Sequence, residues 1–263
     1  MEHPVVHSCY LGMDISPEQL ISEHFFMHIL EGTIVGYDGG RQYRYEAGDT
    51  FIARKNHLIR YTKIRKKEVF NRIVIAFDET FLRSFLERNP YASGVSDQED
   101  SLLTVRSSGR IEDFLQSLQP YYEGDQMVDN GVAQLKRAEL LQILLEEDPR
   151  LADVFFNFSD PEKVDMQAFM NRNFRFNIPL ERFAFLSGRS LSAFKREFRH
   201  LFHKTPGAWL TRRRLEEAHF QIRHANRSPS DVYLDVGFEN LSHFSFAFKK
   251  QFGKSPQALV KER

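Results

Sequence analysis

The chain has 263 residues, of which 41% are hydrophobic and 27% are charged, a composition typical of a folded protein of about two domains and not of a disordered chain. No stretch approaches the roughly 20 uninterrupted apolar residues that span a bilayer, residues 1–16 lack the basic-then-apolar order of a secretory signal, and the single cysteine, Cys9, excludes an internal disulfide and a thiolate zinc cluster. We therefore expect a cytoplasmic protein.

The formal net charge is zero, but it divides unevenly between two parts of the chain. Residues 161–263 carry 19 Lys and Arg against 10 Asp and Glu, a charge of +9, whereas residues 1–160 carry 17 against 26, a charge of −9. A basic segment is the expected electrostatic footprint of a protein that binds a polyanion. The division therefore indicates two parts with different tasks.

The N-terminal part is predicted to be β structure. Turn signals, Asp-Gly-Gly at 38–40 and Glu-Ala-Gly-Asp at 46–49, separate short segments rich in β-branched and aromatic residues. The predicted strands are 24–37, 41–45, 50–53 and 68–77. Several short strands between turn signals are typical of a β-sandwich or a small barrel.

Helical periodicity follows the last of these strands. Asp78 is the predicted N-cap of a helix that ends at Asn89 and Pro90, and residues 92–101 are a predicted loop. Two further helices are predicted at 109–118 and 130–147 from apolar residues at helical spacing: Ile111, Phe114, Leu115 and Leu118, then Val132, Leu135, Leu141, Leu144 and Leu145. This helical hairpin could close the core of the β module or pair with a second subunit, and an apolar stripe alone does not separate these alternatives.

The strongest feature of the sequence is a repeat in the basic part. Residues 190–206 read SLSAFKREFRHLFHKTP and residues 240–256 read NLSHFSFAFKKQFGKSP, an offset of 50 residues. Phenylalanine recurs at every fourth position in both copies, so each set lines one face of a helix. Basic residues fall on the opposite faces: Lys195, Arg196, Arg199, Lys249 and Lys250. Such helices can pack on a small domain by their aromatic side and face DNA with their basic side.

Each copy of the repeat follows a short helix and a turn. Pro179 begins the first short helix and Gly188 lies in its turn, while Ser228 and Gly237 hold the matching positions in the second unit. A helix, a glycine-containing turn and a second helix form the helix-turn-helix pattern. Between the units, residues 205–224 form a predicted linker helix of about 30 Å, comparable to the roughly 34 Å between successive major grooves on one face of B-DNA.

These motifs resemble those of the AraC/XylS family of bacterial transcription regulators. The unit at 180–206 is similar to the family's less constrained first half. The segment 231–256 resembles the second helix-turn-helix signature through Gly-Phe at 237–238, Ser-x-Phe at 242–244, Phe-Lys-Lys at 248–250 and Gly-x-Ser-Pro at 253–256. The resemblance implies a fold of seven helices that carry two DNA-reading helices.

The resemblance also implies which residues contact bases and phosphates. They are Ser190, Ser192, Lys195, Arg196 and Arg199 in the first unit, and Asn240, Ser242, His243, Ser245 and Lys249 in the second. The family often has Arg or Lys where this chain has Phe246, which cannot make the bidentate contact of Arg to guanine but can touch a thymine methyl. We therefore expect Lys195 and Arg196 to carry more of the sequence discrimination, and Trp209 to belong to the core.

In this family the N-terminal part is commonly a cupin-like β-barrel that senses a small molecule or forms a dimer, and the turn at 46–49 with its following strand is similar to a cupin hairpin. Enzymatic cupins bind metal through His-x-His and a later Glu and His, whereas here His24 and His28 are four apart, Glu31 is three further on, and His57 lies much later. We predict no metal and no cofactor. The sequence contains no G-x-S-x-G, no glycine-rich phosphate loop and no C-x-x-C.

Together these observations predict an α+β fold: a cupin-like β-barrel sensing domain at 1–105, a helical hairpin for dimerisation at 106–158, and an all-α DNA-binding domain with two helix-turn-helix units at 159–263. The predicted function is a sequence-specific DNA-binding transcription regulator, not an enzyme, whose N-terminal domain senses an effector or mediates dimerisation. The alternatives are control by a partner protein through that domain and a metal-dependent cupin enzyme. The expected partner is double-stranded DNA, bound by a homodimer away from any membrane, with RNA polymerase and a small-molecule effector as further candidates.

Overall fold

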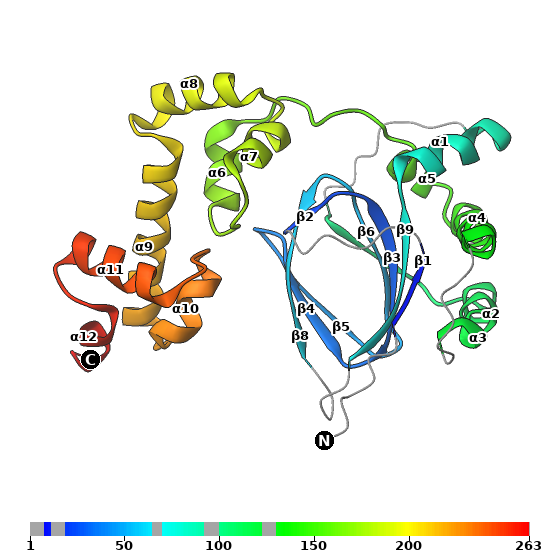
Figure 1. Ribbon diagram of the computed structural model, residues 1–263, viewed down its shortest axis with the longest axis horizontal. Coiled ribbons are helices and arrows are strands. Elements are labelled where there is room, and N and C mark those ends of the chain that lie inside the picture. Colours follow the sequence, from blue (N-terminus) through cyan, green and yellow to red (C-terminus); the bar gives the residue numbers. More distant parts are fainter. Residues whose placement is uncertain (1–7, 12–18, 65–69, 92–99, 123–129, 263) are drawn as a thin grey trace. The chain divides into compact units, whose positions relative to one another are not determined.

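The computed structural model describes residues 8–11, 19–64, 70–91, 100–122 and 130–262. The chain divides into two compact units, Met1–Ser159 and Asp160–Arg263, which are drawn in blue to green and in green to red in Figure 1. Among the described residues, no helix combines the length and the apolarity that crossing a membrane requires.

The strands of the first unit pair into three sheets. They are β1 (Ser8–Leu11), β2 (Leu20–Ile21), β3 (His24–Glu31), β4 (Thr33–Tyr37), β5 (Gln42–Glu46), β6 (Thr50–Ala53), β7 (His57–Leu58), β8 (Arg60–Ile64), β9 (Asn71–Phe77) and β10 (Leu102–Val105). The strand orders are β1-β9-β3-β6-β10, β2-β7 and β5-β4-β8. Neighbouring strands run antiparallel, except that β1 is parallel to β9.

The predicted strand at 24–37 forms two strands, because Gly32 interrupts it with a φ of 96°. A Cβ at this position would lie 2.6 Å from the ring of Phe70, so glycine meets both the backbone and the packing requirement. The strand predicted at 50–53 has those bounds, and the one predicted at 68–77 begins at Asn71 in the described chain. Residues 92–99 of the predicted loop lie outside the described residues, as do the side chain of Cys9 and residues 65–69.

The five-stranded sheet buries both of its faces. One face packs towards the three-stranded sheet around Phe25, Met27, Ile34, Phe51 and Val74. The other face packs against helices, and its strand residues are Phe26, Ile52, Ile73, Ile75 and Phe77. The fold is therefore α+β as predicted, but within the described residues the strands form separate sheets and not a closed hydrogen-bonded barrel, because β5 and β10 each end a sheet.

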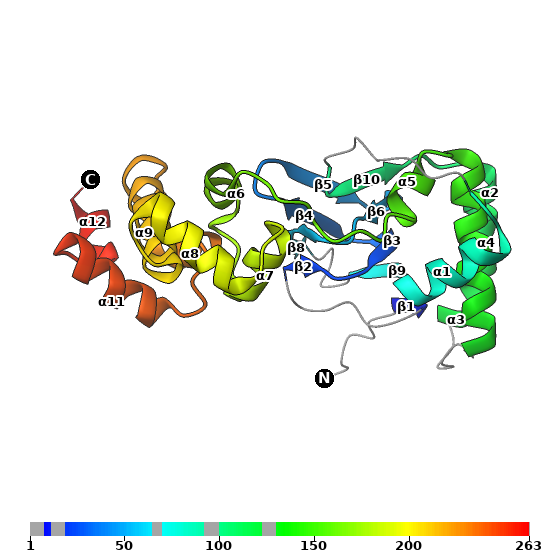
Figure 2. The ribbon, with the colours of Figure 1, turned by 90° about the horizontal axis from the view of Figure 1, so that it is seen from above.

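The helices of the first unit cover the second face of that sheet. They are α1 (Glu79–Arg88), α2 (Gly109–Ser117), α3 (Gln119–Tyr122), α4 (Asn130–Glu147) and α5 (Leu151–Phe155). Asp78 caps α1 as predicted and accepts a hydrogen bond from the backbone N–H of Phe81 at 2.9 Å. Figures 1 and 2 show α2 and α4 side by side against the sheet.

The apolar stripe of the α2/α4 hairpin closes the core of its own unit. Phe114, Leu141 and Leu144 are buried there. Of the two roles that the sequence left open for this stripe, the structure therefore shows the first, which is to close the core of the β module. The prediction that Leu135 belongs to this stripe is wrong, since its side chain is 73% exposed. At 100° per residue, the nine positions between Leu135 and Leu144 place the two residues on opposite sides of α4.

The second unit is helical throughout its described elements. These are α6 (Met166–Asn173), α7 (Leu180–Leu186), α8 (Leu191–Phe202), α9 (Pro206–His224), α10 (Pro229–Asp235), α11 (Leu241–Phe252) and α12 (Pro256–Lys261). Pro occupies the first turn of α9, α10 and α12, each behind a Thr or Ser cap, the position where its missing N–H costs nothing. Figure 1 shows α8 joining the start of α9 and α11 lying beside the later part of α9.

Candidate nucleic-acid interface

Two helices of equal length, α8 and α11, are held in the second unit by their phenylalanines. Phe194 and Phe198 of α8 and Phe244 and Phe248 of α11 are completely buried. Their spacing of four residues places each pair on one face. The opposite face of each helix is therefore left to solvent.

Trp209 connects α8 to the linker helix α9. Its indole contacts the rings of Phe198 and Phe202, with centroid distances of 5.7 and 4.9 Å. Trp209 is half-buried; it packs on these rings but is not one of the buried core residues, so the prediction that it belongs to the core holds only in part. This aromatic cluster holds α8 at the first turn of α9.

Polar side chains cap the N-terminus of both helices. Ser190 Oγ accepts from the N–H of Ala193 at 3.4 Å, and Asn240 Oδ1 accepts from the N–H groups of Ser242 and His243 at 2.8 and 3.1 Å. Both caps stand at the positions that the repeat aligned. Each cap satisfies donors of the first turn and fixes where the helix begins.

The exposed face of α8 is basic. Lys195, Arg196 and Arg199 are exposed, and within the described chain none of their side chains makes a hydrogen bond or ion pair. Glu197 is the acidic residue of α8, and Arg189 donates a hydrogen bond to each of its carboxylate oxygens. This pairing holds the pKa of the carboxyl below its usual range. The face of α8 that is turned to solvent thus carries cations without a balancing carboxylate.

The exposed face of α11 contains no acidic residue at all. Of the ten predicted contact residues, nine are exposed: Ser190, Ser192, Lys195, Arg196, Arg199, Asn240, Ser242, His243 and Lys249. Ser245 is half-buried. Phe246, which departs from the family pattern, is 71% exposed, an unusual position for a large apolar side chain that has no internal packing role.

The glycines of both turns lie in the left-handed region and face a close neighbour. Gly237 has a φ of 94°, and a Cβ there would lie 2.6 Å from the carbonyl oxygen of Arg175. Gly188 has a φ of 69°, and a Cβ there would lie 2.5 Å from the backbone of Glu162. Each turn therefore needs glycine for its conformation and for the approach of a neighbouring segment.

Arg214 is a structural residue that the sequence reading did not single out. Its guanidinium donates to the carbonyl oxygens of Phe174, Phe176 and Gly237 at 2.7, 2.6 and 2.9 Å, and burial lowers its pKa to about 10. These bonds hold α9 against residues 174–176, which follow α6, and against the glycine turn of the second helix-turn-helix unit. Arg212 belongs to the same run of three arginines but pairs with Glu216 on the surface. Only the tertiary structure therefore distinguishes the role of Arg214 from that of Arg212.

The three histidines considered for a metal site each bond to a neighbouring protein group: two to the backbone of Lys55 and one to Thr50. His24 Nδ1 accepts from the N–H of Lys55 at 3.2 Å, His28 Nδ1 lies 2.8 Å from Thr50 Oγ1, and His57 Nδ1 lies 2.9 Å from the carbonyl oxygen of Lys55. Burial lowers the pKa of His24 to about 3. In the described chain, no three His, Cys, Asp or Glu side chains are grouped to hold a metal ion.

Comparison with known proteins matches both units. The family model of the ExsA N-terminal regulatory domain matches residues 24–154, and that of a helix-turn-helix domain matches residues 184–262. Thermoregulatory protein LcrF of Yersinia pestis is 25% identical over 235 residues, which are 87% of this chain and 85% of that protein. HTH-type transcriptional regulator ExsA of Pseudomonas aeruginosa is 22% identical over 261 residues, 95% and 91% of the two chains.

Solved structures also resemble the chain. A variant of ToxT from Vibrio cholerae aligns with 93% of this chain and 90% of its own, at 13% identity and a TM-score of 0.44. The DNA-binding domain of AdpA in complex with a target DNA aligns with 37% and 87%, at 25% identity and a TM-score of 0.35. The two family models follow one another along the chain, and the relatives that span most of its length are transcription regulators and not enzymes. The chain belongs to the AraC/XylS family of transcription regulators, with an N-terminal regulatory domain and a DNA-binding helix-turn-helix domain.

Proposed function

We propose that α8 and α11 enter successive major grooves of one DNA duplex, with α9 as the spacer between them. The observation that carries this proposal is the pair of 12-residue helices, each with a buried aromatic face and an exposed basic face, on a frame built around a 19-residue helix. Nineteen helical residues span about 28 Å, which is comparable to the roughly 34 Å between successive grooves.

The residues of α8 divide into two groups by side-chain chemistry. Lys195 and Arg196 read base edges, since Arg and Lys recognise the O6 and N7 atoms of guanine. Ser190, Ser192 and Arg199 contact phosphates and set the register on the duplex. The absence of intramolecular partners for the three basic side chains in the described chain supports a contact with DNA for each of them.

The second groove is read by α11. Asn240, Ser242, His243, Ser245 and Lys249 are the contact residues that we assign to it. The exposed ring of Phe246 packs on a thymine methyl, a contact that carries base information without a hydrogen bond. We infer that α11 contributes less discrimination than α8.

The N-terminal unit controls how the DNA-binding unit acts. VirF of Yersinia enterocolitica, 25% identical over 237 residues, is named a virulence regulon transcriptional activator, which supports an activator that contacts RNA polymerase. A homodimer fits repeated binding sites, because the second subunit binds at a raised effective concentration. A small-molecule effector and a partner protein are the two alternatives for the signal.

Selection of duplexes from a random library by the full chain tests the DNA-binding proposal. We expect two preferred blocks about 10 base pairs apart and an affinity that falls linearly with salt on logarithmic axes. Arg196→Ala should relax one base position by about 1–3 kcal/mol, whereas Arg88→Ala removes the same charge from α1 and should change nothing. Equal loss on scrambled duplexes, or binding that is indifferent to salt, would contradict the proposal.

A further inference from the structure

The strand β10 has one open edge. It pairs with β6 on one side only, and the carbonyl of Ser101 accepts from the N–H of Arg54 at 3.0 Å. Bonded and non-bonded pairs alternate along an antiparallel ladder. Because the Ser101–Arg54 pair is bonded, Leu102 and Thr104 direct their backbone N–H and C=O groups to the open side, where no described backbone group pairs with them.

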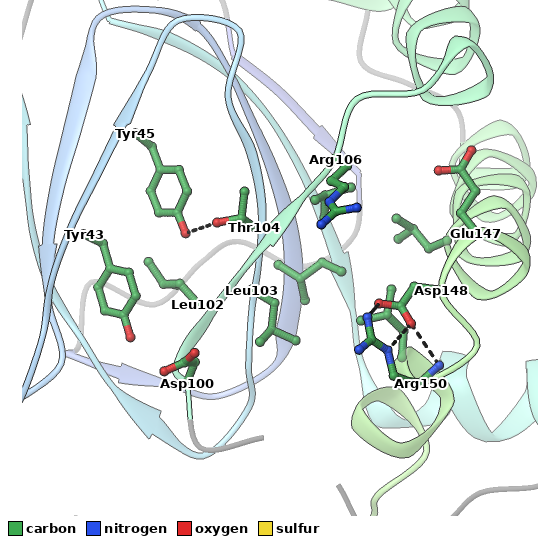
Figure 3. A pocket seen from close by; sticks show the side chains of 14 residues that line it. Tyr43, Tyr45, Asp100, Leu102, Leu103, Thr104, Arg106, Glu147, Asp148 and Arg150 are labelled. Carbon is green, nitrogen blue, oxygen red and sulfur yellow. Dashed lines mark hydrogen bonds and ion pairs between the residues drawn. The ribbon is translucent and has the colours of Figure 1, made fainter. Parts of the chain in front are cut away.

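This open edge lies in a recess. A cavity of about 540 Å³ runs along residues 100–106. Tyr43 and Tyr45 of β5 form its wall on one side of the strand, and Leu144 of α4 and Leu151 of α5 form the wall on the other, as Figure 3 shows for the labelled residues. The volume falls in the range of specific binding cavities, about 300–1,000 Å³.

The side chains of β10 alternate between the two walls. Leu102 belongs to the core between the sheets, whereas Leu103 and Val105 pack against the core under the helices. On the tyrosine side, the hydroxyls of Tyr45 and Thr104 lie 3.1 Å apart. A strand added at this edge would place its own side chains alternately on the tyrosine wall and on the leucine wall.

Most of the charged side chains that the structure describes around the recess are paired within the chain. Asp148 and Arg150 form a two-point ion pair with distances of 2.8 Å, and Arg41 pairs with Asp100. Arg106 lies directly beyond the end of β10 and is exposed. Its guanidinium makes no hydrogen bond or direct ion pair within the described chain. It helps Arg150 to lower the pKa of Asp148, but the hydrogen bond from Arg150 is the largest cause of that shift, so Arg106 can pair with an incoming carboxylate.

We propose that the open edge of β10 binds an extended peptide segment of a partner protein, with alternating apolar residues and a carboxylate that pairs with Arg106. An exposed edge is a ready template for strand addition. A single extended segment can enter the recess, whereas the same edge of a second copy is itself recessed behind β5, α4 and α5, so the walls of two copies would collide. This inference rests on the proposed regulatory role of the N-terminal unit and names its input as a protein.

A displayed library of random seven-residue peptides, selected on the full chain, supplies the probe. We expect enriched peptides with alternating apolar positions and an Asp or Glu at one end. A fluorescein-labelled copy of one of them should lose at least 10-fold in affinity on Arg106→Glu, and exchange of its carboxylate for Lys should restore binding to that variant. Failure to enrich any peptide, or affinity that is indifferent to Arg106, would overturn the proposal.

Two matched comparisons test strand addition itself. N-methylation of the peptide should abolish binding at the alternate amides that bond to β10 and should leave binding unchanged at the amides between them. This test uses the wild-type protein. Thr104→Pro removes an outward N–H and should abolish binding, whereas Thr104→Val keeps it and should bind normally. Arg196→Ala should bind the peptide like the wild type while losing DNA discrimination, so the two proposals fail separately. Equal tolerance of every N-methyl group, or capture of a second copy in place of the peptide, would refute strand addition.

Discussion

Arg189 holds the carboxylate of Glu197 at two points, with Nε 2.9 Å from Oε2 and Nη2 2.7 Å from Oε1. Arg189 follows the glycine turn of the first helix-turn-helix unit and its side chain is only 5% exposed, while Glu197 belongs to α8. Lys163 lies 3.6 Å from the same carboxylate. The turn before α8 therefore supplies the cation that offsets the one carboxylate of that helix.

Arg189→Ala should weaken DNA binding without removing any residue of the proposed contact face. The variant leaves Glu197 without its main partner beside Lys195, Arg196 and Arg199, and we expect a loss of about 1–2 kcal/mol in the free energy of unfolding, less than for a fully buried pair because Glu197 is partly solvated. Urea denaturation and duplex titration measure the two effects. Glu197→Gln is the matched control and should retain DNA affinity; weaker binding by this control would exclude the charge argument.

Phe246 should be dispensable for folding and informative for base choice. Its side chain is 71% exposed, so Phe246→Ala should change the free energy of unfolding by less than about 0.5 kcal/mol. We expect the variant to lose preference for thymine at one position of the site. Phe246→Arg should prefer guanine there by about 1–3 kcal/mol. Competition among duplexes that differ at single positions measures this, and an unchanged base profile for both variants would remove Phe246 from the interface.

Two left-handed glycines provide a matched test of close packing. Gly237 and Gly253 have φ of 94° and 77°. A Cβ at Gly237 would meet the carbonyl of Arg175 at 2.6 Å, whereas no atom of the described residues would lie within 4 Å of a Cβ at Gly253. Gly253→Ala should cost about 1–2 kcal/mol for the backbone conformation alone. Gly237→Ala should cost clearly more, since the carbonyl of Arg175 must also move. Thermal unfolding of the two variants compares them, and equal losses would show that the contact at Gly237 relaxes freely.

The buried His24 should make the stability of the N-terminal unit depend on pH. Burial, assisted by Arg54 and Lys55, lowers its pKa from 6.5 to about 3. The unfolded chain therefore binds a proton between these values that the folded chain does not, and stability falls as pH drops below 6.5. The loss should approach about 1.4 kcal/mol per pH unit, or about 2 kcal/mol by pH 5.

His24→Asn is the variant that isolates this effect. Asn places an oxygen where His24 Nδ1 accepts from the N–H of Lys55, and it does not titrate. Its urea-unfolding free energy should decline less between pH 6.5 and 5 than that of the wild type, by about 2 kcal/mol. Parallel pH profiles for the two proteins would contradict a buried neutral histidine.

Local signals in the sequence predicted most of the helical unit. The four-residue spacing of phenylalanines predicted α8 and α11, and in the first unit Asp78 was predicted as the cap of α1. These features could be predicted because helix caps and helix faces depend on residues within a few positions of one another. The strands were predicted less completely: β2 and β7 have two residues each and carry no periodicity.

The amino-acid sequence alone determined that the basic part of the chain is a pair of helix-turn-helix units, because periodicity, turn glycines and charge are all local properties. The tertiary structure decided which long-range partners each side chain has. It placed Arg214 against three carbonyls and left Arg196 in solvent, turned Leu135 outward, and left the edge of β10 open. These outcomes depend on contacts between residues far apart in the chain, and no local pattern encodes them.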